Sequence, residues 1–130
     1  MIIHPIIELK DSTWADQVEN SDTLVIIMFY SPTCPHCQVM QPPFEQYAKE
    51  FKGTVVFAKL NVLNNPEIVS KYGILGTPTF KLFCQGKPIY ELTGAIYPTL
   101  LKKAVEDALT HGSECATHTT WFDPGITGYA

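Results

Sequence analysis

Arginine is absent from this chain of 130 residues, in which all nine basic residues are lysines and the net charge is −4. Arginine makes the bidentate contacts that are typical of phosphate and base recognition, and lysine cannot reproduce that geometry. The negative net charge also opposes contact with a polyanion. We therefore expect no nucleic-acid partner.

Long hydrophobic runs are absent as well, and none approaches the roughly 20 apolar residues that cross a membrane. The opening M-I-I-H-P-I-I lacks both the basic start and the apolar core of a signal peptide. We therefore expect a cytoplasmic protein that does not associate with a membrane.

Cysteine is scarce, with four residues in the chain, which is too few for a secreted disulfide scaffold. A chain of this length forms one domain that buries roughly two thirds of its unfolded surface, so the fold should not need disulfides. In a reducing compartment such cysteines are more often catalytic or metal-binding than structural.

Cys34 and Cys37 follow the apolar run Leu24 to Tyr30, whose seven residues predict a strand buried on both faces. Pro35 suits the first turn of a helix, because its missing N–H would have no partner there anyway. The two cysteines should therefore share one face at the start of a helix, within disulfide range. Strand, dithiol and helix together indicate a thiol–disulfide oxidoreductase.

The remaining pattern predicts one α/β domain over residues 1–110 and an irregular tail over residues 111–130. An edge strand over residues 2–9 should precede a short helix that Asp11 or Ser12 caps. After the cysteines we expect a helix to about Phe51, a parallel strand over 54–61, a short helix over 66–72 opened by Asn65, a hairpin of strands 79–84 and 89–93, and an amphipathic helix over 98–109.

Cys34 is the expected nucleophile. Only a thiolate attacks disulfides, and an ordinary cysteine, with a pKa of about 8.5, is only slightly ionised at neutral pH, so something must lower its pKa. A helix N-terminus contributes roughly 0.3 to 2 kcal/mol to an anion, which can lower the pKa by about one unit. Unpaired first-turn N–H groups act in the same direction, as does His36 whenever it is protonated. Cys37 would then resolve the mixed disulfide that Cys34 forms.

Half of a zinc site is the main alternative for two cysteines spaced in this way. The other candidate ligands do not form a second close pair in the sequence: Cys84, Cys115, His111 and His118. We therefore expect no metal, and no cofactor beyond a redox-active Cys34–Cys37 disulfide.

The C-P-H-C motif after an apolar strand, together with G-T-P-T-F from Gly76 to Phe80, resembles the thioredoxin superfamily over about residues 6–110. The resemblance implies a central mixed sheet of four to five strands with helices on both faces. It also implies that Cys34 attacks, that Cys37 resolves and that Pro78 is a cis-proline facing them. Without the resemblance, Pro78 would be read only as a turn or strand-start proline.

Two sets of supporting residues follow from the same resemblance. Thr77 would offer its backbone N–H and C=O groups to an extended substrate, and a glycine after the last strand would let a partner approach. The implied substrate-binding residues are Thr33, Leu75, Gly76, Thr77 and Gly94. The implied residues that tune the pKa or the redox potential are Pro35, His36, Lys59 and Pro78.

Two departures from the thioredoxin pattern W-C-G-P-C concern the site itself. Thr33 replaces the tryptophan, and Pro35-His36 is similar to the loop of bacterial disulfide-forming oxidases, in which the histidine makes the pair more oxidising. Met28 stands where thioredoxins bury an aspartate, while the lysine partner of that aspartate is retained as Lys59. We expect Lys59 to reach solvent, to find another acceptor or to lower its pKa.

A third departure is the presence of Cys84 at a hairpin end and Cys115 in the tail. The simpler interpretation is two incidental free cysteines. The alternative is a second, regulatory disulfide, either between them or to a partner.

These patterns predict a monomeric enzyme that reduces protein disulfides and receives electrons from a reductase or a small thiol. The compartment favours reduction and the C-P-H-C loop favours oxidation, so a disulfide oxidase or isomerase is one alternative. A redox-inert module that holds clients in the Thr77–Pro78 groove is another.

Overall fold

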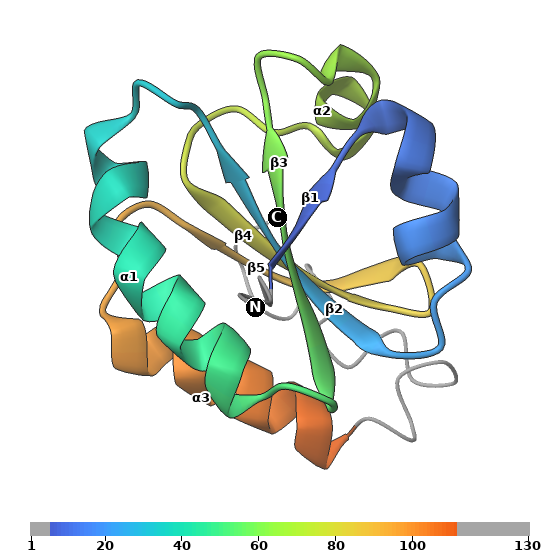
Figure 1. The fold of residues 1–130 in the computed structure, drawn as a ribbon, viewed down its shortest axis with the longest axis vertical. Coiled ribbons are helices and arrows are strands. Elements are labelled where there is room, and N and C mark those ends of the chain that lie inside the picture. Colours follow the sequence, from blue (N-terminus) through green and yellow to red (C-terminus); the bar gives the residue numbers. More distant parts are fainter. Residues whose placement is uncertain (1–5, 112–130) are drawn as a thin grey trace, which may run out of the picture.

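The computed structural model describes residues 6–111, which form a five-stranded mixed sheet with helices on both faces (Figure 1). β2 runs parallel to β3 and β3 parallel to β1, whereas β4 is antiparallel to β2 and β5 to β4. The expected mixed sheet is therefore confirmed. In the spatial order β1-β3-β2-β4-β5, the bounds are β1 (Ile6–Leu9), β3 (Val55–Asn61), β2 (Leu24–Tyr30), β4 (Thr79–Cys84) and β5 (Lys87–Thr93).

β2 lies at the centre of the sheet because its side chains are apolar on both faces, as in other fully covered strands. Three of them belong to the core under α1 (Pro35–Glu50) and α3 (Pro98–Thr110): Leu24, Ile26 and Met28. Three others belong to the core on the opposite face: Val25, Ile27 and Phe29. The strand that leads to the cysteines is thus held from both sides.

The two faces are covered by different elements. α1 and α3 lie side by side over one face (Figure 1). The other face carries α2 (Pro66–Tyr72) and the turns around Trp14, whose ring centroid lies 5.3 Å from those of both Tyr72 and Phe83. The expectation of helices on both faces is confirmed.

The expected short helix after the first strand is wrong in detail, because Asp11 caps a different helix. The segment forms a 3-10 turn at Asp11–Thr13 and a π-helical turn at Ala15–Glu19. The Asp11 carboxylate instead accepts hydrogen bonds from the backbone N–H groups of Glu67, at 3.2 Å, and Ile68, at 3.0 Å, in the first turn of α2.

Asn65 has exchanged roles with Asp11. It is the N-cap residue of α2, but its side chain makes no capping hydrogen bond. Its side chain accepts from the backbone N–H of Asp11 at 2.8 Å and donates to the backbone carbonyl of Asn61 at 2.9 Å. Residues more than fifty positions apart therefore close the start of α2.

The hairpin is tighter than expected, because β5 begins at Lys87 rather than at Ile89 and leaves a two-residue turn. Gln85 and Gly86 have φ values of 51° and 82°, as the primed turns of tight hairpins require. A Cβ atom on Gly86 would lie 2.9 Å from the Cα of Glu19, so only glycine fits against that turn.

The expected tail, 111–130, lies almost wholly outside the described residues.

We predict that Asp11→Ala lowers the free energy of unfolding by about 1 to 2 kcal/mol, because two N–H groups of α2 lose their acceptor. Urea denaturation followed by circular dichroism measures the change. Asp16→Ala, at an exposed position of the neighbouring turn, is the matched control and should change stability by less than about 0.5 kcal/mol. Equal stability of the two variants would contradict the capping role.

Candidate active site

Cys34 lies between the end of β2 and the start of α1, where it is the N-cap residue of that helix. Its backbone is extended, with φ −88° and ψ 113°, so the residue stands just outside the helix. Its sulfur accepts a hydrogen bond from the backbone N–H of Cys37 at 3.2 Å. The Sγ atom thus takes the place that a serine or aspartate oxygen usually has at a helix N-terminus.

This geometry changes the pKa values of the two thiols in opposite directions. Although partial burial opposes it, hydrogen bonds with the side chains of Cys37 and Thr77 and with the backbone of Cys37 and His36 lower the pKa of Cys34. Burial and the hydrogen bond to Cys34 raise the pKa of Cys37, whose side chain is only 4% exposed. Cys34 is therefore the readier nucleophile, and Cys37 is the thiol that keeps its proton.

The loop before β4 brings Thr77 and Pro78 to the cysteines, and Gly94, directly after β5, contacts Pro78. The Thr77–Pro78 peptide bond is cis, and Pro78 is buried. The carbonyl oxygen of Thr77 lies 3.5 Å from the Cys34 sulfur, which donates to it as a thiol. The backbone N–H of Gly94, which has φ 94°, donates to the Pro78 carbonyl at 2.8 Å.

Other residues expected at the site lie on the segments that flank the cysteines and Thr77. Thr33, Pro35 and His36 are exposed, and the Thr33 hydroxyl lies 3.2 Å from that of Ser31. Leu75 is 99% exposed, on the loop that leads to Thr77. A pocket of about 260 Å³ lies beside this loop, lined by Val62, Val69, Ile74, Leu75, Gly76 and Thr77.

Lys59 has found another acceptor, which is one of the three outcomes expected from its sequence. Its ammonium group lies 3.8 Å from the Glu8 carboxylate and 5.2 Å from the centre of the Tyr30 ring. The Tyr30 hydroxyl donates to Glu8 at 2.9 Å. Burial, that hydrogen bond and the charge of Glu8 raise the pKa of Tyr30 to about 12.

Glu8 and Tyr30 were not among the residues that the sequence marked as functional. Glu8 lies directly opposite Lys59 in the register of β1 and β3. Opposite charges on two expected strands were a possible signal, but the sequence does not show which strands pair or in which register.

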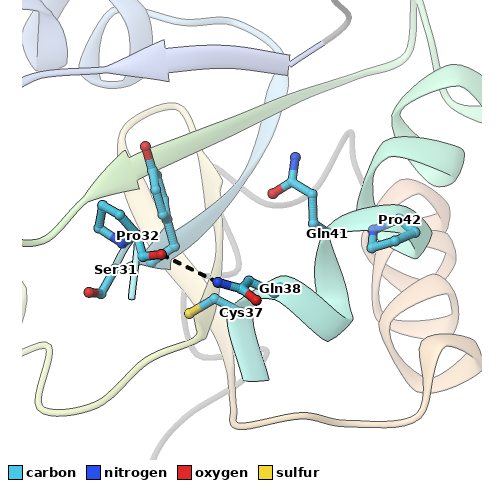
Figure 2. Close-up of a pocket in the computed structure, with 7 residues that line it drawn as sticks. Ser31, Pro32, Cys37, Gln38, Gln41 and Pro42 are labelled. Atoms are coloured by element: carbon cyan, nitrogen blue, oxygen red, sulfur yellow. Dashed lines mark hydrogen bonds between the residues drawn. The ribbon is translucent and has the colours of Figure 1, made fainter. Parts of the chain in front are cut away.

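A second pocket, of about 290 Å³, opens beside Cys37 (Figure 2). Cys37, Gln38 and Gln41 reach it from α1, while Ser31 and Pro32 come from the loop after β2. The Gln38 amide donates to the Pro32 carbonyl at 3.5 Å across one end. Tyr30 and Pro42 complete its lining.

The remaining cysteine and metal-ligand candidates lie away from this centre or outside the described residues. Between residues 6 and 111, no three side chains of His, Cys, Asp or Glu lie together in a way that could hold a metal ion. Cys84 is buried at the end of β4 and belongs to a disulfide, so the interpretation of it as an incidental free cysteine is wrong. Cys115 and His118 lie outside the described residues, and a pairing with Cys115 stays a prediction.

No helix in the described part of the chain combines the length and the apolar composition that a membrane span needs.

Comparison with known proteins gives a consistent set of relatives. The model of the thioredoxin family matches residues 5–107. The chain is 31% identical to thioredoxin 1 of Nostoc sp., over 78% of this chain and 95% of that protein. It is also 31% identical to thioredoxin of Chlorobaculum thiosulfatiphilum, over 77% and 93%. Protein disulfide isomerase-like 2-3 of Oryza sativa is 35% identical over 70% of this chain, which corresponds to 21% of that longer protein.

We predict that Cys37→Ala raises the pKa of Cys34, because the side-chain hydrogen bond that stabilises the thiolate is lost. The rate of Cys34 alkylation by iodoacetamide should then rise at a higher pH than in the wild type, as followed by mass spectrometry. Val39→Ala, at a 64% exposed position of the same helix, is the control and should leave the midpoint unchanged. An unchanged midpoint in Cys37→Ala would contradict this cause of the shift.

Proposed function

The chain belongs to the thioredoxin family, and from this premise we propose that it reduces disulfides of protein substrates, with Cys34 as the attacking and Cys37 as the resolving cysteine. The observation that carries the proposal is the Cys34 sulfur at the N-terminus of α1, with its lowered pKa and its hydrogen bond from Cys37. A thiolate in that position is stabilised before any substrate arrives.

The reaction has two exchanges. The Cys34 thiolate attacks one sulfur of the substrate disulfide, the substrate S–S bond breaks, and the leaving thiolate takes a proton from solvent. Cys37 then loses its proton and attacks Cys34, which releases the second substrate thiolate and forms the Cys34–Cys37 disulfide. Two electrons pass to the substrate, and an electron-donating reductase or small thiol returns the pair to the dithiol.

The substrate's backbone would dock beside Thr77. The Thr77 carbonyl group already lies at the Cys34 sulfur. An extended substrate peptide that hydrogen-bonds to Thr77 would therefore bring its own disulfide to the nucleophile. Thr33, Leu75, Gly76 and Gly94 would form the surface around that peptide. The extreme exposure of Leu75 supports contact with an apolar side chain of the substrate.

The direction of net electron flow and the location are parts of the same proposal. We place the protein in the cytoplasm, where a supply of reducing electrons would drive disulfide reduction. We propose that it acts as a monomer. The tuning roles of Pro35, His36, Lys59 and Pro78 belong to the proposal as well. Oxidation or isomerisation of disulfides is the second candidate, favoured by the His36 backbone, which contributes to the lowered pKa of Cys34.

A client-binding module without redox activity would show no turnover in an assay of disulfide reduction. Insulin reduction with dithiothreitol as electron donor should show turnover by the wild type and only the uncatalysed background for Cys34→Ser. In the Cys37→Ser variant, Cys34 should still attack insulin, but the mixed disulfide should accumulate because Cys37 is missing. A non-reducing gel would show this mixed disulfide. Turnover by Cys34→Ser at the wild-type rate would overturn the enzymatic function.

A further inference from the structure

Cys37 must lose a proton in the second exchange of the proposed reaction, and the identity of the acceptor inferred for it rests on that reaction. In the free dithiol, the Cys37 thiol hydrogen-bonds to the Cys34 sulfur, and that bond raises its pKa. In the mixed disulfide, Cys34 is a neutral disulfide sulfur and can no longer take the proton. A group outside the cysteine pair must therefore receive it before Cys37 can attack.

The pocket beside Cys37 limits the candidates. None of its seven lining residues is a carboxylate or a lysine (Figure 2). Two of them hydrogen-bond to a carboxylate just outside the pocket: Tyr30 donates to Glu8 at 2.9 Å, and the Gln41 amide donates to Glu45 at 2.8 Å. The charged and titratable groups that contacts connect to the pocket are thus Glu8 on β1, Tyr30 on β2, Lys59 on β3 and Glu45 on α1. Cys34 and His36 precede Cys37 at the start of α1.

The two carboxylates differ in what connects them to the pocket. A tyrosine hydroxyl can accept a proton on its oxygen while it gives its own proton to the next acceptor. A primary amide such as that of Gln41 has no comparable acidic or basic group at neutral pH. The Lys59 ammonium group has no lone pair to accept a proton, and it lies 3.8 Å from the Glu8 carboxylate.

We infer that Glu8 receives the proton of Cys37 through the Tyr30 hydroxyl and water in this pocket. The pocket of about 290 Å³ has room for several waters, since each occupies about 30 Å³ in the liquid. The Cys37 thiol gives its proton to the pocket water and becomes a thiolate. The Tyr30 hydroxyl passes a proton on to Glu8, whose carboxylate becomes a carboxylic acid. Cys37 then bonds to Cys34, the bond from Cys34 to the substrate sulfur breaks, and Glu8 later releases its proton to solvent. Glu8 and Tyr30 are positioning residues, because they act on the reacting sulfurs through water in the pocket.

Stopped-flow reaction of the reduced protein with 5,5′-dithiobis(2-nitrobenzoate) separates the two exchanges. Attack by Cys34 releases one coloured thiolate, and resolution by Cys37 releases the second. For Glu8→Gln we expect an unchanged first phase and a second phase slowed by roughly tenfold near pH 6.5, less than the ~10²–10⁴ typical of general bases because the pocket opens to solvent. Tyr30→Phe should behave in the same way. The difference should disappear at high pH, where Cys37 ionises without a base.

Glu45→Gln is the matched control, since it removes the other carboxylate that is hydrogen-bonded to a pocket residue, and it should leave both phases unchanged. A purely electrostatic effect of Glu8 would speed the second phase in Glu8→Gln, because removal of a nearby negative charge favours the Cys37 thiolate. Either that acceleration or equal rates in wild type and Glu8→Gln would overturn the inference. Loss of both phases in the wild type would instead overturn the proposed function.

Discussion

The hydrogen bond from the backbone N–H of Cys37 to the Cys34 sulfur is the contact on which the site depends. It exists because Cys34 is the N-cap of α1 and Cys37 lies one turn into the helix. A helix start offers N–H groups that need an acceptor, and here a sulfur supplies it. The same turn exposes one thiol to these donors and buries the other, so the pKa values of Cys34 and Cys37 move in opposite directions. The proposed roles, attack by Cys34 and resolution by Cys37, follow from that difference.

This turn keeps its position because β2 is packed from both faces and paired with β3 and β4. The neighbouring β4 begins immediately after Pro78, so the sheet also determines where the Thr77 carbonyl meets Cys34. The hydrogen bond from Gly94 to Pro78 ties in the end of β5. Two segments far apart in the sequence thus meet at one sulfur, and a third, at Gly94, is joined to them through Pro78.

The sequence predicted the parts of the molecule that local pattern controls. The uninterrupted apolar run of β2, the proline after Cys34 and the amphipathic stripe of α3 led to elements with nearly the observed bounds. Contacts between distant side chains could not be predicted in this way. Asp11 leaves its own turn to cap α2, and Glu8 meets Lys59 and Tyr30, because the register of parallel strands brings them together. Periodicity and motif spacing carry no information about such register.

The central proposal is that electrons flow from the cysteine pair to substrate disulfides, and the reduction potential of the Cys34–Cys37 pair tests it most directly. A more stable Cys34 thiolate makes the disulfide more oxidising, so the lowered pKa of Cys34 and the function of a reductase are in tension. Equilibration with glutathione buffers measures the potential. A reductase requires a value closer to about −270 mV, as in thioredoxin, than to about −120 mV, as in a strong disulfide oxidase. A value near about −120 mV would contradict reduction as the net reaction.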